Sequence, residues 1–427
     1  MKKVILLLIA MIGLSSISYA QMTAKQLKKA TKEAQAVVKK AKDELMSPTG
    51  NLKTARSLIE QAMTNELTIN KSETWSVAGD IFKVLYLNEN QKAYQNVAFD
   101  TVSMYNYLNK MYEYYILCDS LEQIPNDKGK TSMSCREKNA MELDRNRSNF
   151  INGGIFYFNN RKDFAKAFKM FEKYYEMGNV PMLKPYNDAD PNSASYAIEY
   201  AYYPTLAAYQ LQDYENVLKY VDLGMQDSLR GEDCLWIKTE SYEQLKDTTN
   251  WIETLQEGVV KYPANNYFFD RLIAYYYTTE QMDKLEKFAQ KMIEDNPDKA
   301  YSYYVIGYLR QEQKNLEAAI EAYKTAIEKD PELKEAHINL GLCYLLQANN
   351  FMESKSDLRM NSNAYKKALD DEKIYYNQAR PIFEKVRVLA PEDIKKWGLQ
   401  LYQIYYKLNL AKELNEIETT LKSEGLL

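Results

Sequence analysis

Few residues in this 427-residue sequence have the types and spacing that catalysis requires. His337 is the one histidine, and the sequence contains no clustered cysteine set beside it, so a zinc site or a Cys-His or Ser-His-Asp arrangement is not expected. Acids such as Asp370 and Asp371 lie on a charged helical stretch that predicts a solvated face. We therefore expect no enzyme activity, no cofactor and no metal, with a site hidden in the loops as the weakest hypothesis.

The four cysteines raise a different question of chemistry. Cys118 and Cys135 flank a predicted loop at residues 122–134, so their backbones could approach within disulfide distance. Two hypotheses stay open for this pair: a disulfide bond, or two buried thiols. Cys234 and Cys343 lie far apart in the sequence, and we expect both to stay free.

The elements that must position these residues repeat at a constant interval. Pro263, Pro297 and Pro331 are equally spaced along the sequence. Proline cannot continue the hydrogen-bond ladder of a helix, so each proline predicts the end of a helix. Repeats of the same length are therefore expected to start at residues 198, 232, 266, 300 and 334.

Residues 300–333 carry small and aromatic residues at spacings that suit two packed helices. The positions are Tyr303, Ile306, Gly307, Ala319, Tyr323, Ala326 and Pro331. They resemble the tetratricopeptide repeat (TPR) family, with Tyr303 in the usual tryptophan position and Arg310 as a departure from the pattern. His337 takes the Tyr303 position one repeat later, which predicts a packing role. The resemblance implies an all-α fold, a curved TPR-type α-solenoid of stacked antiparallel helix hairpins.

Residues 1–20 look like a secretory signal. Lys2 and Lys3 precede an apolar run, and the small residues Ser18 and Ala20 suit cleavage after Ala20. The apolar run is too short to span a bilayer. We predict an exported protein, periplasmic or secreted, with no transmembrane segment in the mature chain.

The remaining sequence is expected to form two regions. Residues 21–197 are predicted to form divergent TPR-like helical hairpins, and residues 198–427 a regular TPR array with an insertion at about 345–370. The helices expected in the first region include residues 24–46, Leu52 to Thr64 and a helix from Cys135 to about Asn159. Loops are expected at about 88–99, 122–134, 180–194 and 347–363.

In TPR proteins, positions 2, 5, 9, 12 and 13 of each first helix line the concave groove. Across the five regular repeats these 25 positions hold seven acidic, eight aromatic and no basic residues. Carboxylates beside aromatic faces suit a cationic ligand, through charge and cation–π contacts. The candidate ligand-binding residues are Tyr202, Trp236, Glu240, Tyr267, Asp270, Tyr301, Tyr304, Tyr308 and Glu312.

Two functions fit this groove. The leading hypothesis is an exported, non-enzymatic scaffold that binds a protein or peptide segment, with a basic segment favoured. The alternative is a carbohydrate- or peptidoglycan-binding envelope protein, because aromatic side chains also stack on sugar rings. The net charge of −4 and the lack of a basic face argue against nucleic acid. The oligomeric state is not determined by the sequence.

Overall fold

The computed structural model describes residues 22–126, 129–360 and 362–427. The regular elements in these ranges are helices, which confirms the all-α prediction. None of the described helices is long and apolar enough to cross a membrane. The predicted signal segment, residues 1–20, lies outside the described residues.

The described chain forms two compact units, which divide between Trp251 and Ile252. The elements of the N-terminal unit are α2 Ala24–Met46, α3 Leu52–Met63, α4 Ser72–Tyr94, α5 Thr101–Glu122, α6 Arg136–Arg145, α7 Ser148–Phe156, the π-helical turn η2 Tyr157–Arg161, α8 Phe164–Glu176, the 3-10 turns η3 Met177–Asn179 and η4 Pro181–Leu183, α9 Lys184–Ala189, α10 Ser193–Tyr200, α11 Tyr202–Gln210, α12 Tyr214–Gly224 and α13 Gly231–Gln244.

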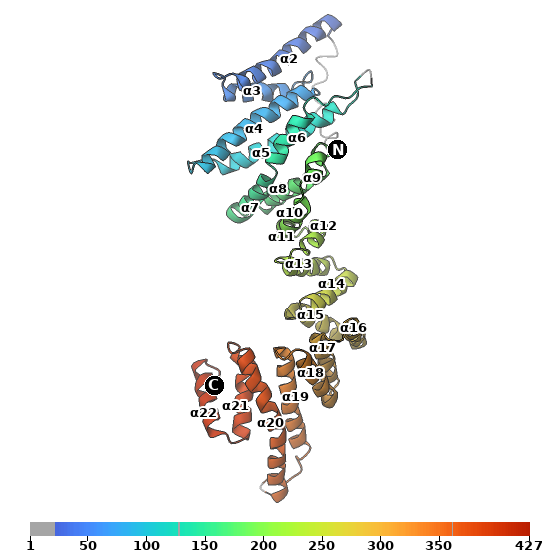
Figure 1. The fold of residues 1–427 in the computed structure, drawn as a ribbon, viewed down its shortest axis with the longest axis vertical. Coiled ribbons are helices and arrows are strands. Elements are labelled where there is room, and N and C mark those ends of the chain that lie inside the picture. Colours follow the sequence, from blue (N-terminus) through green and yellow to red (C-terminus); the bar gives the residue numbers. More distant parts are fainter. Residues whose placement is uncertain (1–21, 127–128, 361) are drawn as a thin grey trace. The chain divides into compact units, whose positions relative to one another are not determined.

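Helix α14, Thr248–Lys261, contains the division between the units. The C-terminal unit continues with α15 Asn266–Thr278, α16 Met282–Asp295, α17 Ala300–Glu312, α18 Leu316–Lys329, α19 Lys334–Glu353, α20 Asn363–Leu389, η5 Ile394–Lys396, α21 Gly398–Lys407 and α22 Ala411–Ser423. In both units consecutive helices pack as antiparallel pairs, such as α4 with α5 and α19 with α20 (Figure 1). The predicted regions 21–197 and 198–427 describe the regularity of the repeats, and that division stays a prediction.

Each regular hairpin turns at one residue in the left-handed backbone region. These residues are Gln212, Lys246, Glu280 and Lys314, and they recur at the same interval as the prolines. The next N–H group donates back across the turn; in the α17–α18 hairpin Asn315 N–H donates to the carbonyl oxygen of Arg310 at 2.9 Å. This is the Schellman pattern, which satisfies the last carbonyl groups of the first helix.

An aromatic ring from the second helix lies over a glycine of the first helix in several hairpins. The pairs are Gly79 with Tyr115, Gly154 with Phe171, Gly307 with Tyr323, and Gly341 with Phe383. A Cβ atom at any of these glycines would lie 2.2–2.5 Å from a ring carbon, far inside van der Waals contact. The missing side chain therefore lets the two helices approach and gives the ring its place in the core.

The tryptophan position of the repeat ties some of the first helices to the chain before them by a side-chain hydrogen bond. The Tyr303 hydroxyl donates to the Pro297 carbonyl oxygen at 3.1 Å, and the His337 Nε2 atom lies 3.0 Å from the Pro331 carbonyl oxygen. Trp75 Nε1–H makes the same bond to Ile69 at 2.6 Å. His337 is buried, and its burial lowers the pKa of the imidazole below its usual value. The histidine has the packing role that its position predicted.

Two predicted loops are shorter than expected because the preceding helices continue. Helix α19 runs to Glu353, so the loop expected at 347–363 covers only 354–362, and α20 begins upstream as expected. The extra turns of α19 pack on α20, where the Phe351 ring lies 5.8 Å from the Tyr375 ring. Likewise α4 continues to Tyr94, which reduces the loop expected at 88–99 to 95–100.

Two other expectations in the N-terminal unit need correction. The single helix expected from Cys135 to about Asn159 is broken between α6 and α7, and it ends in the π-helical turn η2. The connecting loop expected at 180–194 contains η4, α9 and the start of α10. Proline is compatible with these short helices because it stands in their first turns, where no intrahelical donor is needed.

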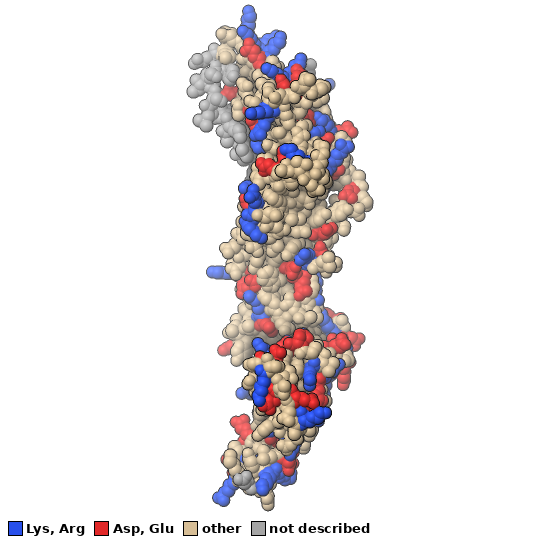
Figure 2. Space-filling view, turned by 90° about the vertical axis from the view of Figure 1, so that its left-hand side faces the viewer, with Lys and Arg blue, Asp and Glu red and all other residues tan. Residues whose placement is uncertain are grey.

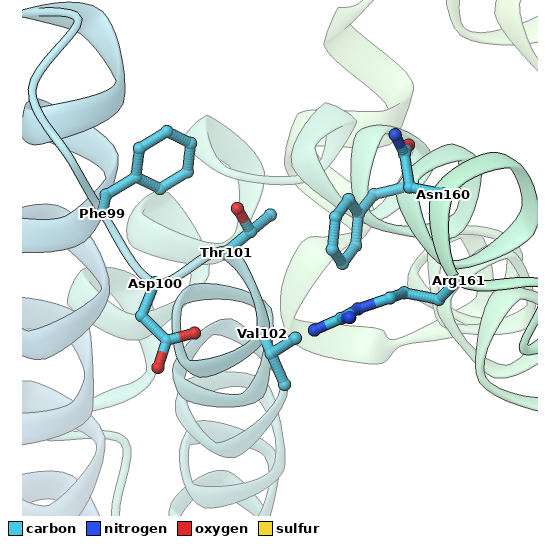
Figure 3. Close-up of a pocket in the computed structure, with 7 residues that line it drawn as sticks. Phe99, Asp100, Thr101, Val102, Asn160 and Arg161 are labelled. Atoms are coloured by element: carbon cyan, nitrogen blue, oxygen red, sulfur yellow. The ribbon is translucent and has the colours of Figure 1, made fainter.

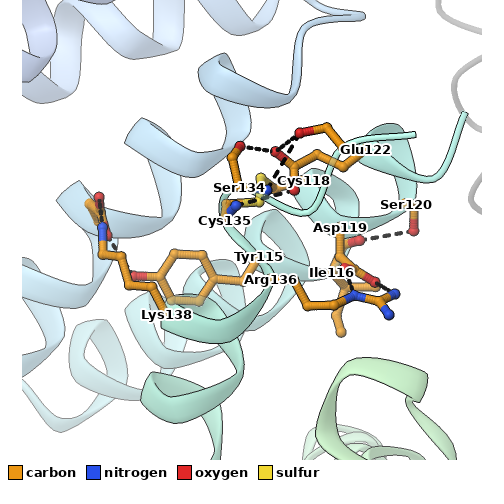
Figure 4. The surroundings of a disulfide bond; sticks show 12 residues. Tyr115, Ile116, Cys118, Asp119, Ser120, Glu122, Ser134, Cys135, Arg136 and Lys138 are labelled. Atoms are coloured by element: carbon orange, nitrogen blue, oxygen red, sulfur yellow. Dashed lines mark hydrogen bonds and ion pairs between the residues drawn. A yellow bond between two sulfur atoms is a disulfide. The ribbon is translucent and has the colours of Figure 1, made fainter. Parts of the chain in front are cut away.

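Cys118 and Cys135 form a disulfide bond in the structure, between the end of α5 and the start of α6 (Figure 4). The buried Glu122 carboxylate accepts hydrogen bonds from the Cys135 N–H at 3.1 Å and from the hydroxyl groups of Ser132 and Ser134. These bonds provide partners for a charge that would be costly to bury alone. Both ends of the intervening loop are therefore fixed.

Removal of the disulfide should destabilise the N-terminal unit. The bond joins residues 17 positions apart, and closing a loop of this size restricts the unfolded chain by about 3 kcal/mol. We expect Cys118→Ser/Cys135→Ser to lose stability of that order in a urea titration of the full chain. The oxidised wild-type protein with added reductant should shift in the same direction. Equal unfolding midpoints in all three samples would contradict the prediction.

Replacing Gly307 by alanine should destabilise the C-terminal unit, although alanine favours helix by about 1 kcal/mol. The added Cβ atom would lie 2.5 Å from the Tyr323 ring, and overpacking of this kind costs about 1–3 kcal/mol. Thermal unfolding should show a lower midpoint for Gly307→Ala. Gly178→Ala is the matched control, because the nearest atom to its Cβ would be 3.7 Å away. A midpoint at or above the wild-type value would disprove the packing role.

The lowered pKa of His337 makes a pH-dependent contribution to stability. The unfolded chain takes up a proton near the ordinary histidine pKa of about 6.5, whereas the folded chain resists protonation. Stability should therefore fall as the pH decreases through that value. His337→Tyr, which copies Tyr303 of the preceding repeat, should reduce the loss of thermal stability between about pH 7.5 and about pH 5.5. Identical pH profiles for the two proteins would refute this assignment.

Candidate functional site

The candidate ligand-binding residues lie on the first helices of successive hairpins. We call positions 2, 5, 9, 12 and 13 of the repeats that start at residues 198, 232, 266, 300 and 334 the first-helix face. In the N-terminal unit the face belongs to α10, α11 and α13, and in the C-terminal unit to α15, α17 and α19.

In the N-terminal unit the predicted rings already have partners. The Arg230 guanidinium carbon lies 4.8 Å from the centre of the half-buried Tyr202 ring. Trp236 packs edge-on against Tyr209 with ring centres 5.5 Å apart. Glu240 follows one turn later on α13 and is half-buried. This part of the face therefore includes an aromatic ring that binds a cation from its own chain.

Phe269 is the centre of the aromatic cluster in the C-terminal unit. Its ring on α15 lies 5.7 Å from the rings of Tyr301 and Tyr304 and 5.8 Å from that of Tyr308, all on α17. Phe269 is not among the site residues predicted from the sequence. It corresponds to Tyr303 and to His337 in the next two repeats, so the period of the repeat could have identified it as a core position.

The candidate tyrosines of α17 differ in how much surface they expose. Tyr301 and Tyr304 are 3% and 8% exposed, so they support the face from beneath and offer little ring surface to a ligand. Burial raises the pKa of both hydroxyl groups, which keeps them neutral. Tyr308 is half-buried, and Tyr277 at the end of α15 is 64% exposed. These two rings are the accessible ones beside the buried pair.

Tyr267, at the start of α15, is half-buried. The Arg271 guanidinium carbon lies 4.8 Å from its ring centre. The arrangement is the same as that of Arg230 over Tyr202 in the N-terminal unit. Two candidate tyrosines thus already have an intramolecular guanidinium over their rings.

Three carboxylates surround the tyrosine cluster. Asp270 on α15 and Glu335 on α19 lie close enough to Tyr301 and Tyr304 to raise their pKa further, after the larger effect of burial, and Asp270 and Glu312 do the same at Tyr308. Partial burial raises the pKa of Asp270 itself. Within the described chain none of the three carboxylates forms a salt bridge. The site thus combines accessible rings with uncompensated negative charge.

Charge is mixed elsewhere on the surface. On the face drawn in Figure 2, acidic and basic side chains are interspersed and separated by uncharged residues. The described residues on this face do not form the continuous basic stripe that nucleic-acid binding uses.

Comparison with known proteins supports the repeat assignment. The family described as "TPR repeat" matches residues 307–347, and no curated protein sequence matches the chain. Similar solved structures include a TPR repeats protein from Bacteroides fragilis, with 19% identity over 61% of this chain and 98% of that one and a TM-score of 0.31. Another is the C-terminal part of a TPR repeat-containing protein from Cytophaga hutchinsonii, with 13% identity over 62% and 92% of the two chains and a TM-score of 0.32.

A third similar structure is PilW, a type IV pilus biogenesis factor, with 14% identity over 55% of this chain and 94% of that one and a TM-score of 0.31. Because these TM-scores are low, the assignment rests on the family match and on the helix geometry. The geometry comprises glycine–aromatic packing in the hairpins, left-handed turns at a constant interval, and an aromatic or histidine side chain in the tryptophan position. Residues 307–347 thus match the TPR repeat family, and the described chain has the all-α fold of stacked helical hairpins that such repeats form.

Proposed function

We propose that this protein is an exported scaffold that binds a basic protein or peptide segment on the first-helix face of its C-terminal unit. Asp270, Glu312 and Glu335 would hold the cationic side chains, and the rings of Tyr308 and Tyr277 would cover their aliphatic parts. The observation that carries the proposal is the group of three carboxylates beside the tyrosines with no salt-bridge partner in the described chain.

Some acids elsewhere in the same unit are paired. Glu286 accepts from Arg310 at 2.7 Å, and Asp298 from Lys329 at 3.0 Å. An acidic cluster without such partners attracts cations from outside the molecule and speeds their association. The two guanidinium–tyrosine contacts within the chain, at Tyr202 and Tyr267, support the same chemistry for an external arginine or lysine.

Export is the second part of the proposal. It is supported by the charged start, the apolar run and the small residues before Gln21. The bond between Cys118 and Cys135 is also suited to an oxidising compartment. Cell fractionation together with the mass of the mature N-terminus would test it; a chain that retains residues 1–20 in the cytoplasm would contradict it.

The alternative is a carbohydrate stacked on the same face. Burial of Tyr301 and Tyr304 leaves less ring surface for stacking than their number suggests. Binding to an acidic face should weaken with ionic strength, because the Debye length is about 10 Å at 0.1 M salt and the attraction between exposed charges farther apart than this is largely screened. Sugar stacking should be insensitive to salt, so the salt dependence separates the two functions.

The charge of the face should decide which peptides bind. We expect the full chain to bind lysine- and arginine-rich synthetic peptides more tightly than glutamate-rich peptides of equal length. Asp270→Asn/Glu312→Gln should weaken that binding at least about tenfold at low salt, since it removes two charges at the contact. Isothermal titration calorimetry at two salt concentrations would measure both effects.

The matched control is Asp298→Asn/Glu321→Gln, which removes two acids that are already paired with Lys329 and Lys324. This control should keep the wild-type affinity. Equal weakening in both double variants would mean that net charge alone is responsible. Unchanged affinity in Asp270→Asn/Glu312→Gln would show that the first-helix face is not the peptide site.

A further inference from the structure

The N-terminal unit contains an open pocket that the first-helix face does not include. Its volume is about 430 Å3, within the range of small-molecule sites. One wall is formed by Phe99, Asp100 and Thr101 at the start of α5, and the other by Phe156, Asn160 and Arg161 at the end of α7 and in η2 (Figure 3). Segments far apart in the sequence thus face each other across one cavity.

Hydrogen bonds hold the α5 wall of the pocket in place. The Asp100 N–H donates to the Glu89 carboxylate at 2.9 Å, and Lys92 binds the same carboxylate. The Asp100 side chain accepts from the N–H of Ser103 at 3.0 Å and from its hydroxyl at 2.7 Å. These bonds to Ser103 lower the pKa of Asp100, so the carboxylate stays ionised.

The opposite wall is set by an irregular helix end. Residues Tyr157–Arg161 form a π-helical turn, which is a rare feature often found at functional sites. The chain then reverses at Lys162 in the left-handed region, and the Asp163 N–H donates to the Tyr157 carbonyl oxygen at 3.0 Å. Both walls are therefore ordered before a ligand arrives, which lowers the entropic cost of binding.

The pocket offers donors, acceptors and flat apolar surface together. The Arg161 guanidinium makes no hydrogen bond or salt bridge with the described residues and lies 5.9 Å from the Phe156 ring centre. Asn160 contributes an amide, and Asp100 and Thr101 contribute oxygen atoms. Phe99 is 38% exposed. A cationic ligand would be repelled by Arg161 and an anionic ligand by Asp100. A neutral polyol, in contrast, can donate hydrogen bonds to the Asp100 carboxylate and accept them from the Arg161 guanidinium.

We propose that this pocket binds a single sugar ring of a neutral glycan. The hydroxyl groups of the ring would bridge Asp100 and Arg161, and its C–H face would lie on Phe99 or Phe156. The site is independent of the peptide-binding proposal, because its residues all belong to the N-terminal unit. It also gives the carbohydrate hypothesis a different location from the first-helix face.

Saturation-transfer NMR on the full chain would test the proposal with defined neutral probes: N-acetylglucosamine disaccharide, cellobiose and maltose. We expect at least one to bind, and Phe99→Ala and Arg161→Gln each to weaken its binding at least about tenfold. Tyr94→Ala is the control for the first substitution, since Tyr94 is 80% exposed and does not line the pocket. Arg359→Gln, at an exposed position of the other unit, is the control for the second.

Three results would overturn the proposal. One is that no neutral saccharide binds. The second is that a saccharide binds to Phe99→Ala and to Arg161→Gln with the same affinity as to the wild-type protein. The third is that acetate or lysine amide binds at this pocket in place of the sugars, which would make it a site for charged ligands. If saccharide binding is lost in Asp270→Asn/Glu312→Gln but unchanged in the two pocket variants, the sugar binds on the first-helix face. That outcome also contradicts the proposal.

Discussion

The contact of an aromatic ring with a glycine is the interaction on which several of the hairpins depend. At Gly307 the missing side chain leaves room for the Tyr323 ring, and the same exchange occurs at Gly79, Gly154 and Gly341. The ring buries a large apolar area while the glycine costs about 1 kcal/mol of helix stability. Burial of the ring exceeds that cost, so a residue that weakens the isolated helix strengthens the pair.

The same contact determines where the candidate site lies. Tyr323, held on Gly307, contacts Tyr304 with ring centres 6.0 Å apart; Tyr304 contacts Phe269 at 5.7 Å, and Phe269 contacts Tyr308 at 5.8 Å. This series of rings links the core of one hairpin to the first helix of the preceding one. Buried rings thus fix the positions of Asp270 and Tyr308, and the accessible chemistry of the face rests on packing that a ligand does not reach.

The sequence predicted the repeat well because its signals are local: the equally spaced prolines and the small residues of residues 300–333 follow from single residue types. The turns were harder to recognise, since the left-handed positions hold Gln212, Lys246, Glu280 and Lys314 where glycine is usual. Burial within the site could not be predicted in the same way. Tyr301 and Tyr304 occupy groove positions by number, but the Phe269 ring covers them, and that contact depends on how two repeats pack.

Stability alone does not explain the unpaired carboxylates of the first-helix face. The chain has 55 lysines and arginines, and some of those in the C-terminal unit pair with acids, as Arg310 does with Glu286. Arg271 follows Asp270 on α15, but its guanidinium lies over the Tyr267 ring, and the pKa of Asp270 stays raised by desolvation, which charge compensation would relieve. A cation from a bound partner would compensate the same charge. The electrostatic stabilisation gained in this way would then contribute to the free energy of binding.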